Sequence, residues 1–192
     1  MKPITYPARP INGGPLDRAH AKHGEWFYEP KYNGWRALVH VPTGTMFNRH
    51  GRRLSIQQEF AKALAQLQDN SPFDWLDCEA LERRHSIGRG TLIVLDWVSE
   101  CVLYSDRRQW LEKFFRPELG PEFVDDDRVY ITPSVPQEKS AEAWATLQRR
   151  NAHVGCPFYE GLVAKEATSK YPIQLRSASE DFPFWVKHRW RF

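Results

Sequence analysis

The chain has 192 residues, which is within the size of one globular domain and long enough to bury a substantial core. Its net charge of +3 permits a polyanionic partner without requiring one, and its mean hydropathy of −0.63 excludes a membrane protein. The three cysteines include no Cys-x-x-Cys pair, so neither a disulfide framework nor a zinc site is expected. The sequence lacks an apolar signal segment, and we expect a cytoplasmic monomer.

The sequence pattern predicts a single α+β domain over residues 1–192, built on antiparallel sheets flanked by helices. Residues 1–24 are rich in Pro and Gly and are expected to form an irregular N-terminal arm. Strands are predicted, in chain order, at 26–29, 35–41, 45–49, 75–82, 91–98, 129–132, 161–166 and 184–190.

Three helices are predicted between these strands. The first is expected over residues 55–68 with Ser55 as its N-cap. Its apolar residues recur at helical spacing: Ile56, Phe60, Leu64 and Leu67. The second is expected to begin at Asp106. Its predicted apolar face consists of Trp110, Phe114 and Phe115. The third is expected over residues 140–150.

Lys31 lies between two strand-like runs, in the segment Glu-Pro-Lys-Tyr-Asn-Gly-Trp-Arg of residues 29–36. A lysine on a short connector bounded by Pro and Gly is exposed to a ligand yet held in position, as a lysine nucleophile must be. Alone, Lys-x-x-Gly is more typical of a solvated turn lysine. The segments that follow along the chain favour the nucleophile.

Residues 29–36 resemble motif I (Lys-x-Asp-Gly-x-Arg) of the covalent nucleotidyltransferases, which include ATP-dependent DNA ligases, RNA ligases and mRNA capping enzymes. Later segments resemble the Ser-Arg-x-Gly segment and motifs III, IIIa, IV and V of the same enzymes, in the same order: 48–54, 76–81, 93–98, 160–165 and 185–189. The Glu-Pro-Lys opening and the Asp-Arg-Arg start of the second helix are most similar to bacterial repair-type DNA ligases.

This resemblance implies an ATP-grasp-like nucleotidyltransferase domain and a three-step ligation. Lys31 would attack the α-phosphate of ATP to give a lysyl-AMP, AMP would pass to a 5′-phosphate, and a 3′-hydroxyl would seal the strand. Because an unperturbed lysine is protonated near neutral pH, nearby positive charge from Lys165 and Lys187 is expected to favour the reactive amine.

The resemblance assigns nucleotide binding to Glu29, Tyr32, Arg36, Glu79, Leu95, Trp97, Lys165, Lys187 and Arg189. Within this set, Arg36 and Glu79 are expected at the ribose, and Glu29 with the backbone of Tyr32 near the adenine edge. Glu160 and Glu79 are the candidate ligands for Mg²⁺ or Mn²⁺, which needs only one or two carboxylates beside substrate phosphates. No P-loop sequence is present, so ATP binding must depend on such a pocket.

Several positions depart from the superfamily pattern. Leu95 stands where an aromatic residue normally stacks on adenine, with Trp97 expected on the same strand face. Asn33 replaces the motif I aspartate, as in some RNA ligases, and Cys78 adds a side chain where motif III has glycine. Arg189 replaces the second motif V lysine with a planar guanidinium.

Ligases normally continue into an OB-fold domain that carries motif VI, and the sequence stops shortly after motif V. We therefore expect no OB-fold domain here, either because the chain is part of a longer protein or because it is a minimal ligase; a partner could also supply that domain. Nucleic-acid contact is then expected from a basic cluster: Arg49, Arg52 and Arg53, with His50. A second such cluster is Arg83, Arg84 and Arg89.

The function that these motifs predict is an ATP-dependent DNA ligase acting on nicked duplex DNA. Two alternatives stay open. One is an RNA ligase with the same chemistry, and the other is a ligase-derived nucleic-acid-binding module without turnover. Retention of the Lys31 and Glu160 motifs argues against the second alternative.

Overall fold

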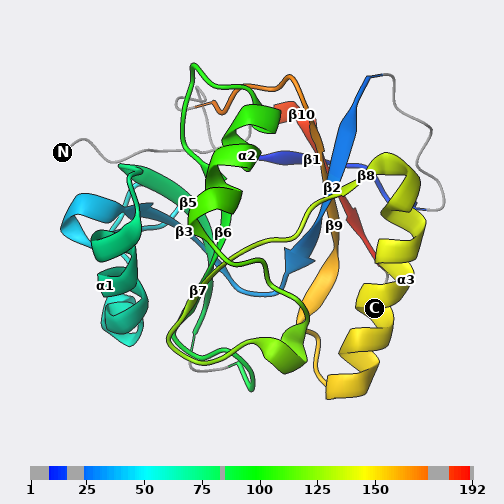
Figure 1. Cartoon of the computed structure of the whole chain (residues 1–192). Helices are drawn as coiled ribbons and strands as arrows, with labels where there is room; N and C mark the ends of the chain where they lie inside the picture. The colour runs from blue at the N-terminus through cyan, green and yellow to red at the C-terminus, as the bar shows by residue number, and fades with distance from the viewer. Residues whose placement is uncertain (1–8, 17–23, 83–84, 173–181, 191–192) are drawn as a thin grey trace.

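The computed structural model describes residues 9–16, 24–82, 85–172 and 182–190. Much of the expected arm, and Arg83 with Arg84, lie outside these ranges. The described residues form two five-stranded sheets and three α-helices (Figure 1), which confirms the predicted α+β class. Among them, no helix is both long and apolar enough to span a membrane.

The first sheet has the order β1-β10-β9-β2-β8 and is antiparallel except where β1 pairs in parallel with β10. Its strands are β1 (Pro10–Asn12), β2 (Trp26–Tyr32), β8 (Val135–Pro136), β9 (Tyr159–Glu166) and β10 (Phe182–Arg189). Part of the expected irregular arm is therefore an edge strand.

The second sheet has the order β4-β3-β5-β6-β7, and only β6 and β7 pair in parallel. Its strands are β3 (Trp35–His40), β4 (Thr45–Phe47), β5 (Trp75–Leu81), β6 (Thr91–Trp97) and β7 (Val129–Ile131). Both sheets are thus antiparallel, as predicted, except for one parallel pair at an edge of each.

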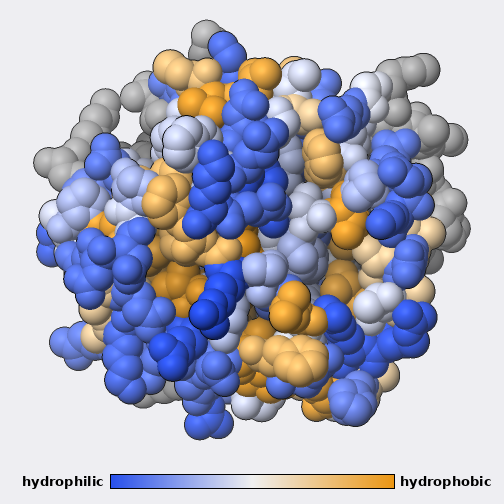
Figure 2. Space-filling model, in the orientation of Figure 1, coloured by the Kyte–Doolittle hydropathy of each residue, from blue (hydrophilic) through white to orange (hydrophobic). Residues whose placement is uncertain are grey.

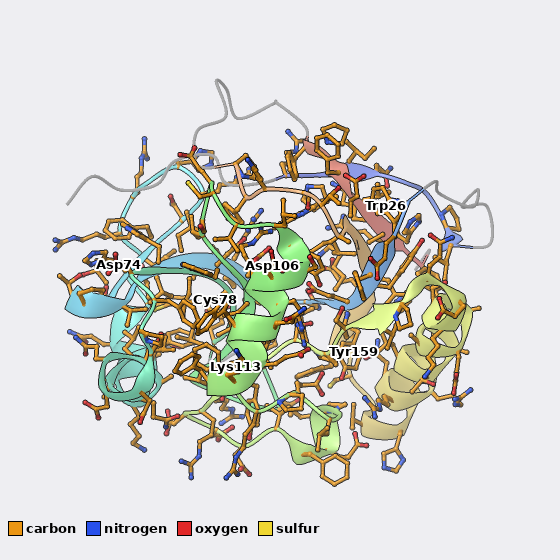
Figure 3. All side chains as sticks on the ribbon, turned by 45° about the horizontal axis from the view of Figure 1, so that its top comes forward. Trp26, Asp74, Cys78, Asp106, Lys113 and Tyr159 are labelled. Atoms are coloured by element: carbon orange, nitrogen blue, oxygen red, sulfur yellow. The ribbon has the colours of Figure 1, made fainter. Side chains whose placement is uncertain are left out.

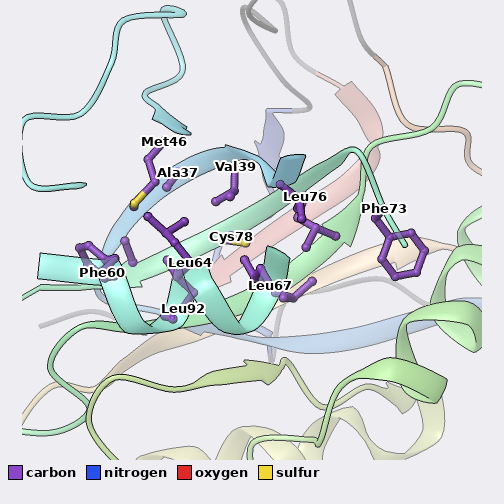
Figure 4. Close-up of a cluster of buried hydrophobic side chains, with 14 of the residues drawn as sticks. Ala37, Val39, Met46, Phe60, Leu64, Leu67, Phe73, Leu76, Cys78 and Leu92 are labelled. Carbon is purple, nitrogen blue, oxygen red and sulfur yellow. The ribbon is translucent and has the colours of Figure 1, made fainter. Parts of the chain in front are cut away.

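Helix α1 (Ala61–Asn70) covers the outer face of the second sheet (Figure 4). Its Leu64 and Leu67 pack against alternate residues of β3, β5 and β6, among them Ala37, Leu76 and Cys78. The Cys78 side chain is fully buried in this layer, and burial raises the pKa of its thiol. The side chain that replaces the motif III glycine is therefore accommodated in the core.

The beginning of α1 differs from the prediction. The helix was expected from Ser55, but a 3-10 turn (Gln57–Phe60) precedes Ala61 and no side chain caps either element. The reason is a competing contact with β4. Met46 N donates to Gln57 Oε1 at 3.1 Å, and Leu54 N donates to the Met46 carbonyl. These bonds hold the segment against the sheet edge before the helix can begin.

Helix α3 (Ser140–Val154) lies beside the first sheet (Figure 1) and extends beyond its expected end, to Gly155 at φ +67°. Its Leu147 joins a second core with aromatic side chains of β2 and β9: Trp26, Tyr28, Tyr32 and Tyr159.

The view in Figure 2 shows that the front of the molecule is mostly hydrophilic, with hydrophobic side chains in several separate places.

Helix α2 (Tyr104–Phe114) buries a different face from the predicted one. Trp110 and Phe114 are 48% and 41% exposed, whereas Arg107 is fully buried. Asp106 and Lys113, labelled in Figure 3, also lie on exposed positions of this helix. Of the predicted apolar face only Phe115 is buried, beside Leu111 in the apolar core. Apolar spacing misidentified the rest because the inner face includes Arg107, which pairs with a buried carboxylate.

That carboxylate belongs to Asp96. Arg107 donates from Nε and Nη2 to its two oxygens at 2.8 and 3.0 Å, and from Nη1 to the carbonyls of Val102 and Ser169. The bidentate geometry and the additional acceptors satisfy a guanidinium that has no contact with water.

We predict that Arg107→Met destabilises the protein by about 3–5 kcal/mol, because it leaves the buried Asp96 without its bidentate partner. Trp110→Ala on the same helix is the control and should change stability by less than about 1 kcal/mol. Urea unfolding of both variants measures the difference. Equal effects would contradict the anchoring role of Arg107.

Candidate active site

A pocket of about 380 Å³ lies where side chains of the two sheets face each other. Most of the residues predicted from the motifs line it: Glu29, Lys31, Tyr32, Arg36, Arg49, Glu79, Leu95, Glu160, Lys165, Lys187 and Arg189. Trp97, Arg52 and Arg53 do not. Its volume falls in the range of small-molecule sites, roughly 300–1,000 Å³.

Strand register explains why motifs I, IV and V meet. Positions across β10, β9 and β2 align in three rows: Arg189–Gly161–Lys31, Lys187–Val163–Glu29 and Trp185–Lys165–Phe27. Because side chains alternate between the faces of a strand, residues spaced by two share one face. The side chains of Lys187 and Arg189 in motif V and of Glu29 and Lys31 in motif I therefore project into one pocket.

Lys31 lies within β2, and the connector begins only at Asn33. The expected position in a turn is wrong because β2 continues through Pro30. Strand β8 pairs with β2 only at Phe27 and Tyr28, so at Pro30 the described neighbour lies on one side alone, where a missing N–H is tolerated. A strand holds the lysine more rigidly than a turn would.

Glu160 reaches the pocket because β9 has an irregular register there. Lys31 pairs with Gly161, whereas Tyr32 pairs with Tyr159, so Glu160 is an extra residue with no partner in β2. A regular strand would put Glu160 on the same face as the buried Leu162 and Ala164. The bulge reverses this alternation and turns the carboxylate towards Lys31.

Gly161 is required at this bulge. Its φ is +150°, and a Cβ built there would lie 1.9 Å from the His188 carbonyl oxygen of β10. Neither that conformation nor that contact is open to another residue. The glycine of Glu-Gly-Leu-Val-Ala-Lys thus permits the position of the preceding glutamate.

The polar group nearest the lysine is Glu160. Lys31 Nζ donates to Glu160 Oε2 at 2.5 Å, and Arg189 Nη2 lies 3.2 Å from the same oxygen. Both side chains of the Lys31–Glu160 pair are 20% exposed, so the pair is accessible from the pocket. A lysine amine, a carboxylate and a guanidinium therefore converge at one end of the pocket.

A buried carboxylate behind the sheet holds this bulge. Tyr32 and Tyr159, which pair across β2 and β9 (Tyr159 is labelled in Figure 3), donate from their hydroxyls to the two oxygens of Glu118, each at 2.9 Å. Glu118 is 1% exposed, and burial raises the pKa of its carboxyl. Since Tyr32 follows Lys31 and Tyr159 precedes Glu160, this carboxylate fixes both neighbours of the reactive pair.

A second irregularity in β6 corrects the prediction for Trp97. Val94 pairs with Cys78 and Asp96 with Asp77, so Leu95 is unpaired in the register. Leu95 and Asp96 both face the pocket side as a result. Trp97 is shifted to the opposite face, where it packs on Phe73 at 5.0 Å between ring centroids. The pocket therefore has Leu95 as an apolar wall and no ring from Trp97.

The Leu95 bulge also leaves a carbonyl for Lys165. Lys165 Nζ lies 2.7 Å from Leu95 O, 2.8 Å from Glu29 Oε2 and 3.5 Å from Asp96 Oδ2. It also lies 4.3 Å from the centre of the Trp185 ring and is 2% exposed.

These contacts correct the expected role of Lys165. It is two rows away from Lys31, and its ammonium group contacts the carboxylates of Glu29 and Asp96 and not Lys31. Instead it holds Glu29. The other Glu29 oxygen accepts from the Tyr104 hydroxyl at 2.6 Å, with Arg108 3.6 Å away.

The β3 and β5 side of the pocket carries Arg36 and Glu79. Arg36 binds the buried Asp77 through Nε and Nη2 at 2.9 and 2.5 Å, and Tyr171 donates to the same carboxylate at 2.8 Å. Glu79 Oε1 accepts from Gly34 N at 2.8 Å. Burial raises the pKa of Glu79 to about 7, although Lys31, the Gly34 N–H and Arg36 oppose the shift.

The sequence departure at Asn33 does not alter the pocket directly. The Asn33 side chain donates from Nδ2 to the Pro157 carbonyl at 3.0 Å, on the far side of the turn from Lys31. An aspartate could not make this bond, because an ionised carboxylate has no donor.

Among the expected nucleic-acid residues that the structure describes, Arg49 alone lines the pocket. Arg52 and Arg53 are exposed beyond its rim, where the Arg52 N–H donates to Asn48 Oδ1. The structure thus separates the basic cluster into one pocket residue and two surface residues.

The pocket offers two carboxylates, Glu160 and Glu79, as ligands for a divalent metal. Within the described ranges, no group of three or more His, Cys, Asp or Glu side chains is arranged to hold a metal ion. Glu160 and Glu79 both line the pocket, and two carboxylates completed by phosphate oxygens and water suit Mg²⁺. The donor set fits a metal that arrives with a nucleotide.

No protein-family model and no curated protein matches the sequence. Solved structures do match. The ligase domain of M. tuberculosis LigD superposes with a TM-score of 0.65 at 20% identity over 96% of this chain. Chlorella virus DNA ligase-adenylate gives 0.57 at 13% identity over 94%, and an archaeal ATP-dependent RNA ligase gives 0.56 at 15% over 98%.

The chain has the fold of a ligase nucleotidyltransferase domain. This confirms the fold that the motif resemblance implies. This chain covers 59% of the LigD ligase domain, 68% of the Chlorella virus DNA ligase-adenylate and 48% of the archaeal RNA ligase.

Sequence reasoning missed several buried residues that support the side chains of this pocket: Asp77, Asp96, Tyr104, Glu118 and Tyr171. The two aspartates lie inside the motif III and IIIa segments, which was a usable signal. The other three lie outside every motif, and only the tertiary fold brings them to the pocket strands.

We predict that Glu118→Leu costs roughly 2–5 kcal/mol, because two buried tyrosine hydroxyls lose their acceptor. In a Tyr32→Phe/Tyr159→Phe background the same change should cost much less, since those donors are gone. Urea unfolding of the four proteins gives the coupling. Additive effects would show that Glu118 is not coupled to the two tyrosines.

Glu79 predicts a pH dependence of stability. Its folded pKa of about 7 exceeds the ordinary 4.5, so the folded state binds more protons between these values, and stability falls as pH rises through this window. Glu79→Gln removes the buried charge. Its thermal midpoint relative to wild type should be higher at about pH 8 than at about pH 5. An unchanged difference would show that the Glu79 carboxyl is not perturbed.

Proposed function

We propose that this chain is the adenylation domain of an ATP-dependent polynucleotide ligase, with residues 1–192 forming one domain that contains no OB-fold. The observation that carries the proposal is the Lys31–Glu160–Arg189 cluster, set by a glycine-dependent bulge inside a nucleotide-sized pocket. The structural similarity to DNA and RNA ligases supports it.

In the first step, Lys31 Nζ attacks the α-phosphorus of ATP. A nitrogen–phosphorus bond forms, the bond to the β-phosphate oxygen breaks, and pyrophosphate leaves. The amine must first lose a proton, and positive charge in the pocket from Lys187, Arg189 and a bound metal would favour that loss. Arg189 would offset negative charge at the phosphates.

The three rows of the first sheet order the rest of the nucleotide. The base would find apolar contacts beside Glu29, from the side chains of Leu95, Val163 and Trp185. Arg36 and Glu79 would face the ribose. Lys187 and Arg189 lie in successive rows towards Lys31, where the phosphates would extend.

A divalent metal, held by Glu160 and Glu79, would supply positive charge to the phosphoryl group during transfer. The chain's own contribution is to hold these carboxylates at the Lys31 end of the pocket. Arg36 and the Gly34 N–H keep Glu79 in place there.

The polynucleotide we propose first is nicked duplex DNA with 5′-phosphate and 3′-hydroxyl ends, because Glu-Pro-Lys and motif IV are most similar to bacterial DNA ligases. RNA is the alternative, which Asn33 favours. Arg49 at the pocket and Arg52 and Arg53 outside it would contact the backbone phosphates.

Incubation with ATP and Mg²⁺ or Mn²⁺ should add one AMP to the peptide that contains Lys31, measured by mass spectrometry. Lys31→Ala and Lys31→Arg should both abolish the adduct, because arginine stays protonated and cannot attack. Lys62→Ala, on the exposed side of α1, is the matched control and should leave it intact. An adduct that survives Lys31→Arg would overturn the proposal. Sealing assays with nicked DNA and nicked RNA then distinguish the two substrates.

A further inference from the structure

A second pocket, of about 340 Å³, lies beside the active site at the β2–β3 turn. Gly34 lines both pockets. The second one has the Trp35 ring as its exposed aromatic wall, Ile87 and Pro157 as further apolar contacts, and polar groups from Asn33 and Ser86; Phe158 lies at its base and is buried. It contains none of the residues assigned above to ATP or metal, so it can be occupied together with the nucleotide pocket.

Trp35 has the properties of a stacking surface. It is 46% exposed at the start of β3, and its indole Nε1 donates to Glu82 Oε1 at 2.9 Å. The hydrogen bond holds the ring edge while part of the ring remains accessible. Because this hydrogen bond already restricts the side chain, binding a ligand on the ring would cost little further conformational entropy.

The turn that carries Trp35 is itself held rigid. Asn33 N donates to the Phe158 carbonyl, and its side chain donates to Pro157 O, each at 3.0 Å. On the other side, His85 Nε2 lies 2.5 Å from Asn33 O. Gly34 cannot be replaced easily, because a Cβ there would lie 2.8 Å from both Ala80 O and the Glu79 side chain.

Position and charge identify the ligand class. The turn joins Lys31 to Trp35, so a polymer whose end reaches Lys31 would pass the second pocket. Arg89 is exposed nearby, with its Nε donating to His85 O, and Arg189 is 51% exposed at the first pocket. Exposed arginines beside the two pockets and the exposed Trp35 ring within the second suit a polynucleotide, which carries phosphates along its backbone and flat bases beside it.

We infer that the second pocket, at Trp35, binds one nucleobase next to the strand end that reacts at Lys31. That base is already unpaired in a single strand and would be flipped out of its pair in nicked duplex DNA. This inference rests on the proposed function and adds the contact that holds the strand. Because every base has a π-face, the contact would be tolerant of sequence. It would serve AMP transfer and sealing but not the reaction of Lys31 with ATP.

The test uses binding of 5′-phosphorylated single-stranded DNA and RNA oligonucleotides to the full chain, measured by fluorescence anisotropy. Trp35→Ala should weaken binding by roughly 5- to 150-fold, the range of one stacked base, whereas Trp35→Phe should retain most of the affinity. Trp110→Ala removes a tryptophan of similar exposure on α2 and should change nothing.

Two further measurements separate stacking from other causes. Stacking neutralises no phosphate, so Trp35→Ala should leave the slope of log affinity against log salt unchanged. An oligonucleotide with an abasic site near its 5′ end should bind wild type more weakly, and Trp35→Ala should remove this discrimination. A changed slope, or an undiminished abasic penalty in the variant, would overturn the inference.

Self-adenylation distinguishes this inference from the proposed function. Trp35→Ala should form the Lys31 adduct at the wild-type rate and fail only with the polynucleotide. Loss of the adduct in this variant would show that Trp35 shapes the active-site turn and would refute the base site. If wild-type protein forms no adduct, the ligase proposal fails whatever the oligonucleotides do. If it forms the adduct but binds no oligonucleotide, the base site alone fails.

Discussion

The irregular pairing of β9 with β2 is the constraint on which the active site depends. Glu160 is an extra residue in β9 that has no partner in β2. It reverses the alternation of side chains, so that Glu160 faces the pocket while Tyr159, Leu162 and Ala164 face the core. Without this reversal the acidic group of the site would point into the apolar layer under α3. Three features on different sides of the sheet maintain it: the absent side chain of Gly161, the contact with β10, and the Glu118 carboxylate bound to two tyrosines.

The opposite end of the pocket is organised by charge. Arg107, Asp96, Lys165 and Glu29 form a continuous buried series from α2 to the base end of the site. Each carboxylate contacts two cations, so no member is left as an isolated charge. This series makes the helix part of the site although none of its side chains lines the pocket. The reactive end is therefore fixed by backbone geometry and the base end by ion pairs.

Sequence alone was sufficient for the fold class, and the motif resemblance named most of the residues that line the first pocket. It placed Lys31 in a connector, whereas β2 continues through this residue. It failed at Trp97, because a single unpaired residue in β6 reverses every later side chain and local alternation carries no trace of it. It failed at Trp110 and Phe114 because apolar spacing does not reveal that the inner face of α2 includes Arg107, paired with Asp96, as well as Leu111. Glu118 was not found because its two tyrosine donors are distant in sequence and meet it only in the folded chain.

The contrast between the two helices that cover the second sheet has a consequence for how the protein responds to acid. Burial alone would raise the pKa of Asp96, but Arg107 and Lys165 lower it below its ordinary 3.8. The stabilisation from this carboxylate is complete above that value and is lost as pH falls through the lower folded pKa. The leucines of α1 carry no such titration. In strong acid, α2 and the base end of the pocket should therefore loosen first, leaving α1 packed on its sheet as a partly folded remnant.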